Sequence, residues 1–216
     1  MGGVRAQSRR GRQRVAVMVC WGVIGGAWAA DPPGTPQSRA AVAACYDSAA
    51  QPPARRAAAL ERALQAAERA VAADEHDALG HFAVFCTLGE RMQLDGVSLT
   101  ALTGVRRLRR EIDRTLELAP EFADALAGKG ALLSDLPRLL GGDVAEGEQL
   151  LRRALAVDPD YLGPRLRLAE LLLDQDRRDD ARREAQTALT VALRKQSTDD
   201  VAAARKLLVR VGPPAP

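Results

Sequence analysis

Few side chains in this sequence could bind a metal ion or carry out nucleophilic chemistry. His76 and His81 are its two histidines, and a spacing of five residues places them on different faces of a helix. They therefore do not match the i, i+4 pair that chelates zinc, and we expect His76 in a turn and His81 on a helix surface. No nucleophile elbow and no dinucleotide fingerprint is present. The sequence predicts no metal, no cofactor and no enzymatic activity.

Gly141 and Gly142 form the glycine pair that most resembles a phosphate-binding turn. A P-loop would continue with a lysine and a hydroxyl, and neither follows. Asp143 and Glu146 instead have the spacing of a capping box, in which a side chain at the start of a helix accepts hydrogen bonds from unpaired backbone amides. We therefore expect a helix to begin here.

Cys45 and Cys86 lie in two predicted helices of neighbouring helix pairs. In an oxidising compartment they could form a disulfide that closes a loop of about 42 residues and stabilises the fold by about 4 kcal/mol. Two buried thiols are the alternative, and the sequence leaves both open.

Residues 1–29 have the features of an export signal. A basic region precedes an apolar run at 15–26 and an Ala-Trp-Ala cleavage motif that ends at Ala29. The apolar run is shorter than the roughly 20 residues that a membrane-spanning helix needs. We expect cleavage near Ala29 and a periplasmic mature protein without stable membrane insertion, while Sec or Tat export stays open.

The formal charge of +3 and the pI of about 9.0 would be typical of a nucleic-acid-binding protein. The excess charge, however, comes from five arginines that precede every acidic residue, namely Arg5, Arg9, Arg10, Arg12 and Arg14. Without them acidic side chains slightly outnumber basic ones. Because binding to phosphate backbones needs a concentrated positive field, we exclude nucleic acid as a partner.

The composition predicts an all-α protein, since aromatic residues make up only 3% and alanine, leucine and arginine dominate. Apolar residues recur at helical spacing in successive segments. The helices expected from these patterns cover residues 38–50 (capped by Ser38), 54–73, 78–91, 104–118, 121–134, 143–157, 161–174, 179–193 and 199–211. Residues 92–103 are expected to be less regular.

One pattern occurs twice in residues 119–188. Pro120 and Pro159 are 39 positions apart, and each follows an apolar helix end and precedes an acidic residue and an aromatic one. Proline suits the first turn of a helix and not its interior, so each marks a turn between helices. Small residues follow at matching intervals, at Gly130, Gly147 and Ala154 in the first copy and at Ala169, Ala181 and Ala188 in the second.

This pattern resembles the tetratricopeptide repeat, a helix–turn–helix unit of about 34 residues. The resemblance implies a short right-handed α-solenoid of about four antiparallel helix pairs with a C-terminal capping helix. We expect a flexible leader at 30–37, the repeat domain at 38–211 and a frayed tail at 212–216.

Such proteins typically bind a protein or peptide partner on a concave surface lined by the first helix of each pair. The resemblance implies a groove formed by Leu79, Phe82, Asp124, Ala127, Ala131, Leu166, Glu170 and Leu173. Residues 136–143 and 155–161 also resemble exported bacterial helical-repeat proteins that include the T component of TRAP-type solute transporters. This second resemblance implies a periplasmic transporter accessory with a small or lipid-like ligand, enclosed between residues 92–103 and 136–142.

Overall fold

The structure, a computed structural model, describes residues 32–95 and 101–212, so the predicted export signal and residues 213–216 lie outside it. Within these ranges the chain is helical and holds no strand, which confirms the all-α prediction. The helices are α1 (Pro36–Ala49), α2 (Pro53–Ala73), α3 (Ala78–Asp95), α4 (Ala101–Leu118), α5 (Ala123–Asp135), the 3₁₀ helix η1 (Arg138–Leu140), α6 (Val144–Val157), α7 (Leu162–Asp174), α8 (Arg178–Arg194) and α9 (Thr198–Val211).

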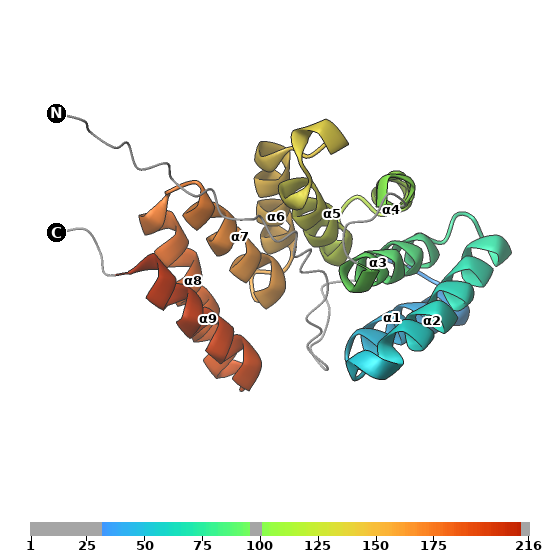
Figure 1. Ribbon diagram of the computed structural model, residues 1–216, viewed down its shortest axis with the longest axis horizontal. Helices are drawn as coiled ribbons and strands as arrows, with labels where there is room; N and C mark the ends of the chain where they lie inside the picture. The colour runs from blue at the N-terminus through green and yellow to red at the C-terminus, as the bar shows by residue number, and fades with distance from the viewer. Residues whose placement is uncertain (1–31, 96–100, 213–216) are drawn as a thin grey trace, which may run out of the picture.

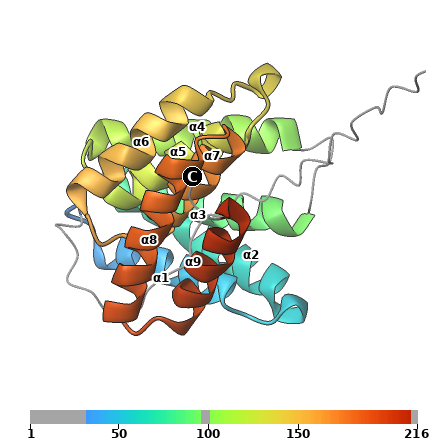
Figure 2. The same ribbon diagram turned by 90° about the vertical axis from the view of Figure 1, so that its left-hand side faces the viewer.

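Consecutive helices pack as pairs, α1 with α2, α3 with α4, α5 with α6 and α7 with α8, and the pairs follow one another across the molecule (Figure 1). The last helix, α9, packs on α8 and α7. Figure 2 looks at the stack from the end formed by α8 and α9. The predicted solenoid of helix pairs with a closing helix is confirmed.

The small residues of the repeat are buried in the helix pairs, and two of them lie at a close helix crossing. Ala169, Ala181 and Ala188 have no exposed surface between α7 and α8. In the preceding pair a Cβ added to Gly130 would lie 3.0 Å from the carbonyl oxygen of Gly147. Since real Cβ contacts are rarely so short, the spacing of α5 and α6 requires a residue without a side chain at this crossing.

The turn that separates α5 from α6 is fixed by backbone geometry and by α4. Gly141 has a φ of 83°, in the left-handed region that glycine adopts without steric cost. Arg109 on α4 donates a hydrogen bond to the Gly141 carbonyl oxygen at 3.0 Å. Asp143 then caps α6 by accepting from the backbone amides of Ala145 and Glu146, as the sequence predicts. The two glycines therefore have a structural role in this turn.

The chain segment before α1 is tied to α3, which differs from the flexible leader expected at 30–37. The Thr35 amide donates to the carboxylate of Asp77 at 2.9 Å, and Asp77 also accepts from the amide of Leu79 at the start of α3. Helix α1 begins at Pro36 with Thr35 as its N-cap, so the prediction that Ser38 caps it is wrong. Thr35 takes this role because its side chain accepts from the Ser38 amide.

Residues 92–103, expected to be irregular, are largely helical where they are described. Helix α3 continues to Asp95 and α4 begins at Ala101. Residues 96–100 lie outside the described part of the chain.

The largest hydrophobic cluster joins α1, α3, α4 and α5. Its buried members are Cys45, Leu79, Phe82, Phe85, Cys86, Val105, Leu108, Ile112, Phe122, Ala125, Leu132 and Leu136. Smaller clusters continue the core between α5 and α9. Among the described helices, none is both long enough and apolar enough to span a membrane.

Candidate functional site

A pocket of about 90 Å³ opens where the odd-numbered helices come together. Every odd-numbered helix from α1 to α9 contributes to its wall, with one further side chain from α6 and one from the turn before α7. The lining residues are Tyr46, Phe82, Asp124, Ala127, Gly128, Ala131, Leu151, Tyr161, Gly163, Pro164, Leu166, Arg167, Asp199, Asp200 and Ala203. The wall is mainly apolar, with aromatic and acidic side chains placed in it.

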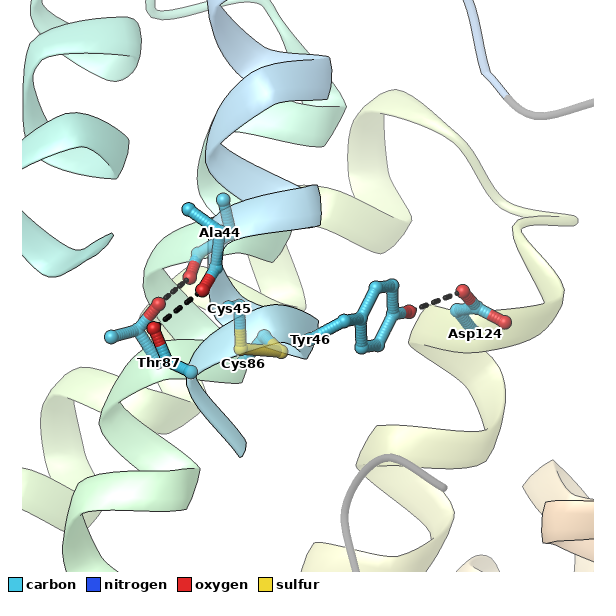
Figure 3. The surroundings of a disulfide bond; sticks show 8 residues. Ala44, Cys45, Tyr46, Cys86, Thr87 and Asp124 are labelled. Atoms are coloured by element: carbon cyan, nitrogen blue, oxygen red, sulfur yellow. Dashed lines mark hydrogen bonds between the residues drawn. A yellow bond between two sulfur atoms is a disulfide. The ribbon is translucent and has the colours of Figure 1, made fainter. Parts of the chain in front are cut away.

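Tyr46 on α1 reaches across the molecule to α5. Its hydroxyl donates a hydrogen bond of 2.8 Å to Oδ2 of Asp124, and both residues line the pocket (Figure 3). Asp124 is buried, so this bond satisfies part of its carboxylate away from bulk water. The contact fixes the N-terminal wall of the pocket against its centre.

The residue before Tyr46 is covalently fixed. Cys45 on α1 and Cys86 on α3 form a disulfide and have no exposed surface (Figure 3). The sequence allowed either a disulfide or two buried thiols, and the structure contains the disulfide. The bond joins the first helices of neighbouring pairs. It therefore holds the turn of α1 from which Tyr46 extends.

Phe82 is the residue of α3 that lines the pocket. It is 1% exposed, and its ring meets that of Phe122 edge-to-face with centroids 4.8 Å apart. Aromatic pairs in this arrangement stabilise each other beyond the area that they bury. Phe82 is therefore a rigid core residue whose surface borders the pocket.

Arg167 is the basic residue of the lining, and its charge is already balanced. It forms ion pairs with Asp135 at the end of α5 and with Glu170 one turn further along α7. Burial raises the pKa of Asp135 to about 6, although the charge of Arg167 opposes the increase. The pair thus connects α7 to the end of α5 at the cost of burying a carboxylate.

Asp199 and Asp200 supply negative charge from the first turn of α9. Acidic residues stabilise this end of a helix because the helix dipole is positive there. Asp200 is buried and accepts a hydrogen bond from the Ser197 hydroxyl, whereas Asp199 is exposed. In the described ranges neither carboxylate forms a salt bridge with a basic side chain.

The structure brings some of the predicted groove residues together and leaves others outside. Phe82, Asp124, Ala127, Ala131 and Leu166 line the pocket.

Three predicted residues do not line it. Leu79 is buried beneath the segment before α1, so close that a Cβ on Gly34 would lie 2.4 Å from it. Glu170 lies within 3.5 Å of both Arg167 and Arg210. Leu173 packs against the cluster that contains Val211. Other parts of the chain cover or engage these three residues, so they do not contribute to this pocket.

Sequence reasoning missed the residues from the two ends of the domain. Tyr46 lies on α1 before the recognisable repeats, and Asp199, Asp200 and Ala203 lie on the helix expected only to cap the stack. One signal was available for α9. It follows α8 as α7 follows α6, so it occupies the place of a further first helix and faces the same side.

The remaining chemistry-bearing residues have structural partners. His81 is buried, and its Nδ1 lies 2.8 Å from Oε2 of Glu111 on α4 while its Nε2 lies 3.0 Å from the Glu75 carbonyl oxygen. The prediction that His81 lies on a helix surface is therefore wrong, because it connects α3 to α4. Among the described residues no group of His, Cys, Asp and Glu side chains is placed to hold a metal ion.

Comparison with known families agrees with this architecture. Residues 138–208 match the model of the tetratricopeptide repeat family. The matched stretch runs from η1 into α9 and includes the pocket residues of α7 and α9. No curated protein matches the chain.

Proposed function

Because residues 138–208 are tetratricopeptide repeats, which act in general as protein-interaction scaffolds, we propose that this protein holds a peptide segment of a partner protein in the pocket between α1 and α9. Stacked helical repeats present a continuous concave surface for this purpose. The observation that carries the proposal is the convergence of every odd-numbered helix on one mainly apolar pocket.

The size of the pocket favours a side chain of a larger partner over an enclosed solute. Pockets that enclose a small ligand usually measure about 300–1,000 Å³. The volume of about 90 Å³ is well below this range and suits one inserted side chain, with the rest of the partner lying along the surface.

The solute-transporter alternative has less support. It predicted an enclosed site between residues 92–103 and 136–142, and residues 96–100 lie outside the described chain. The described residues of these two segments do not line the pocket. We keep a small ligand as an outcome of the experiments below.

Site-specific photo-crosslinking tests the proposal. A benzophenone amino acid at Ala203 faces the pocket, whereas the same group at Val209 on the same helix is outside the lining and 82% exposed. After irradiation in extract of the producing cells, we expect a discrete protein adduct from position 203 that is much weaker from position 209. Equal labelling from both positions, or no adduct from position 203, would contradict the proposal.

A substitution in the pocket provides the second arm. Leu166 lines the pocket and is only partly buried, so Leu166→Gln should weaken the adduct at position 203 while thermal unfolding shows a folded protein. Phe82 is unsuitable for this test, because a polar side chain at a 1% exposed position would disrupt the core.

We further propose that the protein works in the periplasm after removal of residues 1–29. The disulfide supports an oxidising compartment, because such bonds rarely persist in the cytosol. N-terminal sequencing of protein released from the periplasm should begin at Ala30. Protein that retains Met1 and is found in the cytosolic fraction would overturn this part of the proposal.

A further inference from the structure

We propose that the pocket selects a basic side chain, preferably arginine, from the bound peptide. This inference rests on the proposed function and specifies the chemistry of the partner. It comes from the combination of charge, aromatic surface and size in the lining.

The charged groups of the lining leave a negative excess. Asp124, Asp199 and Asp200 line the pocket together with a single basic residue, Arg167. The guanidinium of Arg167 forms ion pairs with Asp135 and Glu170, which are outside the lining, and forms no salt bridge with Asp199 or Asp200. A cation that enters the pocket therefore meets the carboxylates of Asp199 and Asp200, neither of which forms a salt bridge with a basic side chain in the described ranges.

The aromatic lining favours the same kind of ligand. Tyr46 on α1 and Tyr161 in the turn before α7 both line the pocket, and both residues are only partly buried. Aromatic rings attract cations through the negative potential of their faces, and guanidinium groups also stack on them. An acidic peptide would instead face both this potential and the three carboxylates.

Arginine fits the remaining features better than lysine. Its planar group forms two parallel hydrogen bonds with one carboxylate, whereas the lysine ammonium acts as a compact and strongly hydrated charge. Its apolar stem suits the wall formed by Ala127, Ala131 and Leu166. The volume of about 90 Å³ admits one such side chain.

The test begins with an unbiased library of displayed twelve-residue peptides, selected on the whole mature protein. We expect arginine and lysine to be enriched, and aspartate and glutamate to be depleted, relative to the unselected library. Selection on the Asp199→Asn/Asp200→Asn double variant should lose this enrichment. Asparagine retains an acceptor for Ser197, so the helix start is preserved.

Asp179→Asn is the matched control, because Asp179 is also an exposed acid in the first turn of a helix but is outside the lining. We expect the Kd of an enriched peptide, measured by fluorescence anisotropy, to rise about tenfold when its arginine becomes glutamine. It should rise similarly in the double variant and change less than about twofold in the control. Thermal unfolding checks that each variant is folded.

Three results would overturn the inference: no enriched peptides, enriched peptides without a basic excess, or an equal effect of the control substitution. Free agmatine that competes as strongly as an arginine peptide would show that the pocket serves small amines and not peptides. The crosslinking from position 203 does not depend on charge. A partner adduct there without basic selectivity would therefore reject this inference and leave the proposed function standing.

Discussion

Gly147 on α6 lies against Gly130 on α5 so closely that a Cβ added to Gly147 would be 2.8 Å from the Gly130 carbonyl oxygen. This contact sets the distance between the two helices at the centre of the stack. Asp124, Ala127 and Ala131 line the pocket from the same α5 helix, so the crossing also sets the position of the pocket floor.

Gly147→Ala should therefore destabilise the protein although alanine favours helices. The added methyl group also meets the Ser134 Oγ at 2.3 Å, and overpacking of this kind costs about 2 kcal/mol. We expect the melting temperature to fall by about 4–8 °C in calorimetry. Gly163→Ala is the control, since its nearest neighbour would be Tyr161 at 3.5 Å, and it should leave the melting temperature unchanged or raise it. Equal effects of the two substitutions would mean that α5 and α6 can separate freely.

Replacing Cys45 and Cys86 together by alanine should lower the free energy of unfolding by about 4 kcal/mol, because the bond closes a loop between residues 41 positions apart. Urea unfolding of the oxidised protein and of the double variant measures the difference. Two thiols open to alkylation in native periplasmic protein would refute the bond itself.

Tyr46→Phe keeps the disulfide and loses only the hydrogen bond to Asp124, so we expect the free energy of unfolding to fall by about 1 kcal/mol.

Glu90 on α3 should make the protein less stable as the pH rises. Burial raises the pKa of its carboxyl to about 7, although the charge of Arg56 opposes the increase. The folded protein therefore holds this proton more tightly than the unfolded chain, whose pKa is near 4.5. The free energy of unfolding should fall between about pH 4.5 and pH 7 and not recover above this range.

Glu90→Gln removes this charge and should stabilise the protein at pH 8 by about 2 kcal/mol, with little effect at pH 4.5. Chemical denaturation across this pH range measures the effect. Glu121 is exposed, so Glu121→Gln serves as the control. It should not change how the free energy of unfolding varies with pH. If the free energy of unfolding of the Glu90→Gln variant depended on pH as strongly as that of the parent protein, the Glu90 carboxyl would be solvated.

The two partners of the Asp135–Arg167 pair should respond unequally to substitution. Arg167→Met leaves a buried carboxylate without its cation and should cost about 3 kcal/mol at pH 8. The cost should be smaller at pH 5, where Asp135, with its pKa raised to about 6 by burial, is mostly protonated. Asp135→Asn should cost less than Arg167→Met, because the amide oxygen still accepts from the guanidinium. A double-mutant cycle by urea unfolding at both pH values checks this order.

The repeat architecture was predictable because its signals are local. The proline spacing of 39 residues reappears as the spacing between the starts of α5 at Ala123 and α7 at Leu162. Gly130 and Gly147 had to be small because they lie at the crossing of α5 and α6, within one helix pair. A short window of sequence contains all the information needed for such contacts.

The pocket was only partly predictable because its contacts are between distant segments. Leu79 occupies a groove position in a regular repeat, yet the chain near Gly34 folds back over it. Tyr46 joins the pocket because a disulfide and a hydrogen bond to Asp124 hold α1 in place. Neither relationship leaves a periodic trace in the sequence.

The walls of the pocket come from both ends of the folded chain, from Tyr46 near its beginning to Ala203 near its end. During synthesis the ribosome adds α9 only after all the other helices that line the pocket. A protease that removes α9 would take away the pocket residues Asp199, Asp200 and Ala203. If the pocket binds a peptide as proposed, recognition requires α1 and α9 in one folded chain, and we expect copies without α9 not to compete for a partner.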